Sequence, residues 1–193
     1  MSPVTHFLAG WALANAIALN RRERIAVTVA SVVPDIDGFG LIPELLTRNS
    51  THPLRWFSEY HHALHTLWFA LLVAALAACV ATQKWKTAAL AFLAFHLHLL
   101  CDLVSSRGPD GYTWPVPYLR PFSDRWQWSW QGQWALNSWE NIAITLVLLA
   151  LTLVIIQKCG RSPVEMFSVR ADRMVVAAIR SQLSRGKQPI REI

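Results

Sequence analysis

The stretch AFHLHLLCD, residues 94–102, decides how the chain is interpreted. It closes an apolar run that begins near Thr87 and is long enough to enter a membrane. An ionisable group at the centre of a spanning helix costs roughly 2.5–3.5 kcal/mol, and less near an end. His98 and Asp102 are four residues apart, so a helix places them on one face, where they can offer a metal a nitrogen and an oxygen. A buried histidine hydrogen-bonded to a neighbour is the simpler alternative for this stretch alone.

The composition is that of a membrane protein. Of 193 residues, 53% are hydrophobic and only 16% charged, whereas soluble domains have about 25% charged residues. The ten Trp suit the aromatic belts of membrane interfaces. The net charge of +6 is better explained by membrane topology than by nucleic acid, so no nucleic-acid partner is expected. Cys79, Cys101 and Cys159 imply no disulfide framework, because two lie in apolar runs and one near a basic tail.

The apolar runs predict an all-α fold, a polytopic membrane bundle of about five membrane-embedded helices plus a C-terminal amphipathic helix. The runs are Thr5–Leu19, Ile25–Val33, Ala63–Thr82, Thr87–Val104 and Ile142–Ile156. The first is expected to be a retained helix, not a signal peptide, because its arginines follow it. The second reaches only about half of a hydrocarbon core of about 30 Å, so it must tilt, recruit flanking residues or end in a cavity.

Two units are expected along the chain. Residues 1–157 form a membrane-embedded domain, and residues 158–193 form a basic cytoplasmic tail. In the tail, Ser162 to Glu165 fits a capping box with Pro163 at the first helical position, and Gly186 is the expected stop. The helix between mixes arginines with apolar residues, which suits the surface of an anionic leaflet.

Lys and Arg set the predicted topology. They gather at 21–24, at 84–86 and in the tail, which are assigned to the cytoplasm. The N-terminus and the loops 34–62 and 105–140 then lie outside the inner membrane, and the C-terminus lies inside. Loop 105–140 holds most of the Trp residues and is expected at the headgroup level, with a sugar-stacking platform as the alternative.

This topology brings imidazoles and carboxylates from four helix ends to one depth, which predicts a metal cluster. The expected metal ligands are His6, Asp35, Asp37, His61, His65, His98 and Asp102. Asp37 and His62 are the expected catalytic groups, as general base or partner of a ligand. Imidazole and carboxylate without thiolate suit zinc first, with manganese or iron as alternatives. One or two ions are expected, with Asp35 or Asp37 as a bridging carboxylate.

Five motifs in order resemble a bacterial family, the inner-membrane, metal-dependent hydrolases of the YdjM type. They are Thr5-His6, Pro34-Asp35-Ile36-Asp37, the His61–His65 cluster, His98-x-x-x-Asp102 and Gly111-x-x-Trp114-Pro115. The likeness covers about residues 3–125 and implies a membrane-bound hydrolase whose His and Asp residues bind metal. The chain departs from the family's middle motif, which has Arg and often Gly after its first His. Here His62 and Ala63 follow His61, so either His61 or His62 is the ligand.

The expected function is hydrolysis of a phosphoester or ester of a lipid or lipid-linked substrate at the periplasmic face. Membrane lipids and that substrate are the expected partners, and the sequence indicates no particular oligomeric state. Two alternatives stay open. A metal or proton transporter would distribute His and Asp through the membrane depth, and a structural protein would use them to hold helices together.

Overall fold

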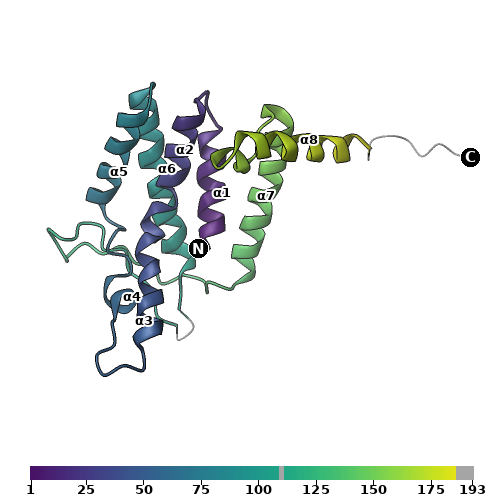
Figure 1. The fold of residues 1–193 in the computed structure, drawn as a ribbon. Helices are drawn as coiled ribbons and strands as arrows, with labels where there is room; N and C mark the ends of the chain where they lie inside the picture. Colours follow the sequence, from purple (N-terminus) through teal and green to yellow (C-terminus); the bar gives the residue numbers. More distant parts are fainter. Residues whose placement is uncertain (109–110, 186–193) are drawn as a thin grey trace, which may run out of the picture.

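The computed structural model describes residues 1–108 and 111–185, and this part of the chain is all-helical, with isolated β-bridges in place of strands. The elements are α1 (Pro3–Ala14), α2 (Arg21–Ala30), the 3-10 helix η1 (Val33–Gly40), α3 (Leu41–Thr47), α4 (Trp56–Tyr60), α5 (Leu67–Val80), α6 (Lys84–Ser105), α7 (Trp139–Cys159), the 3-10 helix η2 (Pro163–Met166) and α8 (Val169–Arg185). Helices α1, α2, α5, α6 and α7 run side by side (Figure 1). Helices α3 and α4 extend from one end, and α8 crosses the other.

Glu23 ties the start of α2 to the turn between α5 and α6. Asn20 and Glu23 form a capping box in which each side chain accepts from the other's backbone N–H, at 3.1 and 2.9 Å. The buried Glu23 carboxylate also accepts from the backbone N–H of Thr82 and Gln83. Glu23 thereby fixes the connection between α5 and α6. This connection is short, which makes the two helices neighbours.

Small residues let α1 and α2 approach closely. A Cβ on Gly10 would overlap the hydroxyl of Ser31, at the end of α2. The core between the helices is likewise rich in alanine, including Ala14, Ala30 and Ala94. This is the packing expected of membrane helices, in which small side chains replace large ones at the contacts.

Two helices, α6 and α7, are long and apolar enough to cross a membrane, and α2 with η1 and α3 forms a third candidate that is bent by 48°. The structure therefore does not support five membrane spans. Helices α1, α2 and α5 have 12, 10 and 14 residues. At about 1.5 Å per residue they fall well short of a core of about 30 Å. The apolar runs overestimated helix length because their ends lie in turns, such as residues 15–20.

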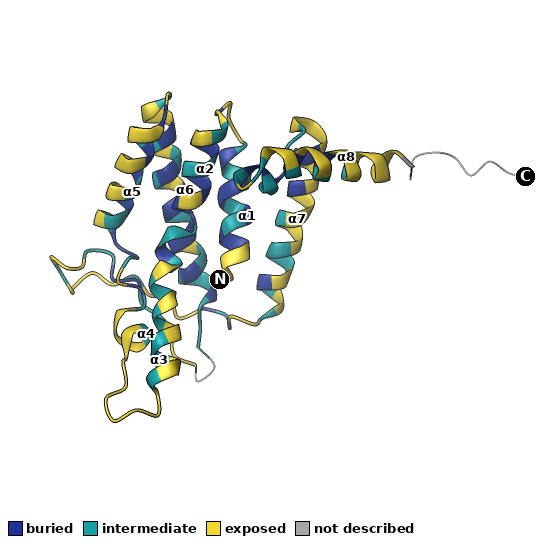
Figure 2. Cartoon of the chain, viewed as in Figure 1, coloured by how far each residue is buried: buried dark blue, intermediate teal, exposed yellow. Residues whose placement is uncertain are grey.

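Most of the α7 surface is apolar and exposed (Figure 2). Of its side chains, only Asn141, Thr152 and Ile156 are buried. A continuous apolar face of this size is costly in water and is stable in hydrocarbon. Helix α7 thus has the character of a lipid-facing span.

The tail begins as two elements and not as the single helix expected from Ser162. Ser162 caps the short η2, accepting from Val164 N–H at 3.3 Å. Helical structure is interrupted between η2 and the start of α8. Glu165 in η2 forms a buried ion pair with Arg24 of α2, with N–O distances of 2.5 and 2.7 Å. The tail is therefore anchored to the helical bundle. The expected stop at Gly186 lies outside the described residues.

Candidate metal centre

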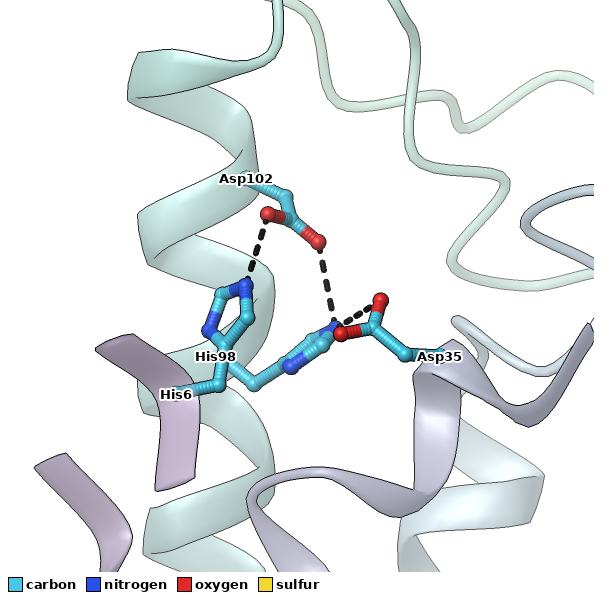
Figure 3. Close-up of side chains that lie close together, drawn as sticks. All are labelled: His6, Asp35, His98 and Asp102. Atoms are coloured by element: carbon cyan, nitrogen blue, oxygen red, sulfur yellow. Dashed lines mark hydrogen bonds and ion pairs between the residues drawn. The ribbon is translucent and has the colours of Figure 1, made fainter. Parts of the chain in front are cut away.

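Asp102, near the end of α6, is the central group of a cluster formed by three elements. Its Oδ1 lies 3.1 Å from His6 Nε2 of α1. Its Oδ2 lies 3.1 Å from His98 Nε2, one turn earlier in α6. Asp35 of η1 approaches His98 Nε2 from the other side at 3.6 Å, and these four side chains point toward one another (Figure 3). One atom of each lies within 4.8 Å of every other, so the cluster could hold a metal ion.

The tautomer of His98 follows from its second nitrogen. His98 Nδ1 lies 3.0 Å from the backbone oxygen of Ser31, which can only accept, so Nδ1 carries the proton. In the neutral ring the Nε2 lone pair then faces the carboxylates of Asp35 and Asp102. Such lone pairs repel one another unless a positive charge lies among them. A histidine that donates to a backbone carbonyl and aims its other nitrogen at anionic oxygens has the orientation of a metal ligand.

The donor set fits a divalent ion. Two imidazole nitrogens and two carboxylate oxygens suit zinc, which binds such ligands at about 2.0–2.2 Å and, in a tetrahedral site, separates them by about 3.3 Å. The separations of His98 Nε2 from Asp102 and Asp35, 3.1 and 3.6 Å, bracket that value, and all four donors lie within 4.8 Å of one another. His6 Nδ1 and Asp35 Oδ2 are buried without a hydrogen-bond partner among the described residues. The amino group of Met1 also pairs with Asp102.

Asp37 organises a second group behind the first. Its carboxylate accepts from Leu64 N–H at 3.2 Å and lies 3.2 Å from His61 Nδ1 and 3.5 Å from His65 Nδ1. His65 joins the two groups, because its Nε2 lies 3.1 Å from His98 Nε2 and 3.5 Å from Asp102 Oδ2. All the expected metal ligands therefore belong to one connected network.

The spacing of His61 and His65 would place them on one face of a helix, but residues 61–66 are not helical. Helix α4 ends at Tyr60 and α5 begins at Leu67, and the residues between form a turn. His62 in this turn has a φ of 76°, in the left-handed region. The turn brings both His61 and His65 to Asp37. The two imidazoles are therefore brought together by irregular backbone and not by a helix.

The pKa values of the two histidines in this turn move in opposite directions. Burial lowers the pKa of His65, but hydrogen bonds to Asp102 and Asp37 outweigh it and raise the pKa to about 9. Burial and the neighbouring His65 and His61 lower the pKa of His62 to about 3. At neutral pH His65 thus supplies the positive charge that the carboxylates require, whereas His62 is uncharged. A metal cation would replace the His65 proton among these ligands.

A cavity of about 480 Å³ opens onto the cluster. Its polar lining includes Asp35, Asp102, His61 and His62, and most of the remaining lining is apolar. Asp37 and His65 do not line it and lie behind the residues that do. Volumes of about 300–1,000 Å³ with a few convergent polar groups are typical of small-molecule sites.

Of the Trp-rich loop, Trp114 is the indole that borders this cavity among the described residues. Its ring meets His61 and His62 edge to face at 5.3 and 5.1 Å. Trp128 instead stacks on Tyr118, whose hydroxyl bonds His96 Nε2 at 2.8 Å. The loop is thus attached to α6 through His96, and one indole, not a platform of several, covers the site.

Two residues of the site were missed by sequence reasoning. Ser31 orients His98 through its carbonyl and also donates its hydroxyl to the His6 carbonyl at 2.9 Å. Gln133 is buried and bonds both Trp114 and the Asp102 carbonyl, which fixes the indole over the cavity. Ser31 could have been suspected because it is a polar residue only four positions before Asp35 of the acidic turn. Gln133 carries no such signal, since its role depends on a loop that returns to α6.

Comparison with known proteins agrees with this picture of a membrane bundle. No curated protein and no solved structure matches the chain. A family match, in contrast, extends over residues 1–179, which includes the cluster, α7 and most of α8. The chain belongs to the family of YdjM inner membrane proteins.

Proposed function

We propose that this inner-membrane protein is a metal-dependent hydrolase acting on a phosphoester or ester of a lipid or lipid-linked substrate at the periplasmic face. The observation that carries the proposal is the convergence of His6, Asp35, His98 and Asp102 within 4.8 Å. When bound there, a divalent ion supplies Lewis acidity toward a phosphoryl or acyl oxygen and makes water a nucleophile near neutral pH.

The geometry favours one ion over two. Among the described residues, His6, Asp35, His98 and Asp102 form the one group whose donor atoms all lie within 4.8 Å of one another. Asp102, not Asp35 or Asp37, is the carboxylate shared by most of the network. We assign Asp37, His61 and His65 to orientation of that site, with Asp37 fixing both imidazoles.

His62 and Asp37 take different roles in this proposal. His62 lines the cavity, so it can contact a substrate or a water there as a neutral imidazole. Asp37 is buried behind the imidazoles and acts through them, so it is a positioning residue. Asp35, with 21% of its side chain exposed, is the ligand nearest to the incoming substrate.

Two observations favour a hydrolase over the alternatives. The network lies at one end of the bundle, around the start of α1 and the end of α6, whereas a transport path would continue through it. A cavity of about 480 Å³ adjoins the network, and a purely structural role in holding helices together does not require one. Zinc is the metal that the donor set suits first.

The test is metal analysis of the full chain purified in detergent. Wild-type protein should retain about one zinc per chain after dialysis, and Asp102→Asn and Asp35→Asn should lose it while still melting cooperatively. Asp124→Asn is the matched control, because Asp124 is exposed and pairs only with Arg120 in the loop. The metal-loaded protein should then release phosphate or fatty acid from a lipid ester. Zinc retained by both cluster variants would contradict the proposal.

A further inference from the structure

The lining of the cavity includes a positively charged side chain that a metal site does not require. Arg107 is the one Lys or Arg among its described lining residues, two residues beyond the end of α6. The carboxylates and imidazoles on the same lining suit a metal ion, but a guanidinium does not bind one. Arg107 follows the end of α6 opposite to the basic residues 84–86, so it does not belong to the basic group at that end.

The structure holds Arg107 in place without using all of its donors. Its backbone N–H donates to the Trp134 carbonyl at 3.1 Å, and its Nη2 donates to the Gln131 carbonyl at 2.5 Å. Its Nε is buried and has no hydrogen-bond partner among the described residues. A charged group with an unsatisfied donor is costly, and the guanidinium, which lines the cavity, would be stabilised by an anion bound there.

The rest of the lining indicates the body of that ligand. Phe39, Phe57 and Leu136 present apolar surface beside Trp114. An apolar chain would be stable against these side chains, and its polar end would then lie between Arg107 and the metal cluster. The cavity therefore suits an amphiphile with an anionic end.

We propose that Arg107 is an anion-binding residue that selects a phosphate-bearing lipid over a neutral carboxylic ester. This inference rests on the proposed function and narrows its substrate to a phosphoester. The guanidinium fork matches two phosphate oxygens at once, whereas a neutral ester offers no charge to it. Arg107 would also offset the repulsion between an anionic substrate and the carboxylates of Asp35 and Asp102.

The experiment measures ligand binding to the full chain in detergent micelles, both zinc-loaded and EDTA-treated. The probes are phosphatidic acid, the neutral diacylglycerol and inorganic phosphate. Arg107→Gln should weaken phosphatidic acid binding by about tenfold or more in both forms, because it removes charge-assisted hydrogen bonds. Diacylglycerol binding and zinc content should not change. Arg125→Gln, an exposed arginine of the same loop, is the control and should leave all three affinities unchanged.

Each contrary result has a distinct meaning. Wild-type affinity of Arg107→Gln for phosphatidic acid, or an equal loss in Arg125→Gln, would overturn the proposal. Inorganic phosphate bound as tightly as phosphatidic acid would overturn the lipid part of it. Where Arg107→Gln fails to fold, Arg107→Lys decides, with a severalfold loss expected because the fork is lost. Failure of the hydrolase proposal appears separately, as zinc retained by both Asp102→Asn and Asp35→Asn.

Discussion

The Nδ1 of His98 donates to the backbone oxygen of Ser31 at 3.0 Å, and this bond fixes which nitrogen of His98 faces the carboxylates. The acceptor is at the end of α2, so the orientation of a ligand on α6 depends on the contact between two helices. The same serine bonds the carbonyl of His6. A single residue thus aligns two of the four donors of the metal site.

Replacement of His98 should abolish metal binding, and replacement of His96 should not. Both lie on α6 and both are hydrogen-bonded, but only His98 faces the carboxylates. We expect His98→Gln to lower zinc affinity by at least about a hundredfold, as measured by competition with a chromophoric chelator. His96→Gln should bind zinc normally and lose about 1 kcal/mol of stability, for the bond to Tyr118. Equal zinc affinity in the two variants would place the metal elsewhere.

The close approach of α1 and α2 should be needed for the site. Gly10→Ala would push a methyl group into the Ser31 hydroxyl. We expect a loss of about 1–3 kcal/mol from overpacking, together with weaker zinc binding, because Ser31 aligns His98 and His6. Thermal unfolding with and without zinc measures both effects. Gly38→Ala is the control, since a Cβ there meets nothing within 4 Å, and a similar loss in that variant would refute the packing argument.

The anchor of the tail should matter for stability more than for the metal. Removing Glu165 leaves Arg24 buried without its partner, which typically costs about 3–5 kcal/mol. A truncation after Cys159 should therefore lower the unfolding midpoint sharply, whereas one after Ser168 keeps η2 and should lower it less. Both should still bind zinc, because no tail residue contacts the cluster among the described residues. Zinc lost from a folded truncation would show that the tail supports the site.

The sequence predicted which residues meet, but not the backbone that brings them together. His98 and Asp102 were predictable because a regular helix places residues four apart on one face. His61 and His65 meet Asp37 through a turn with one left-handed residue, and no periodic pattern indicates such a turn. The number of spans was overestimated because hydropathy extends beyond the residues that are helical, as after Ala14. The position of Arg107 on a cavity could not be predicted, because that cavity forms between segments that are far apart in the sequence.

The last prediction is the orientation of the protein in the membrane. The cluster and the described part of loop 105–140 lie at one end of the bundle, and the basic turns with α8 lie at the other (Figure 1). We expect the two ends to face opposite sides of the membrane, and the excess of Lys and Arg at the second end predicts that it faces the cytoplasm. In a cysteine-free background, Gln127→Cys should react with an impermeant thiol reagent in cells whose outer membrane alone is permeable.

Thr82→Cys, an exposed position in the turn before α6, is the matched control and should react only after the inner membrane is opened. Labelling of residue 127 only after that step, with labelling of residue 82 before it, would show that the protein has the opposite orientation in the membrane. The cluster would then open to the cytoplasm, where free zinc is scarce and soluble phosphoesters are abundant. The substrate would no longer have to come from the periplasmic leaflet, although the ligands of the metal site would be the same.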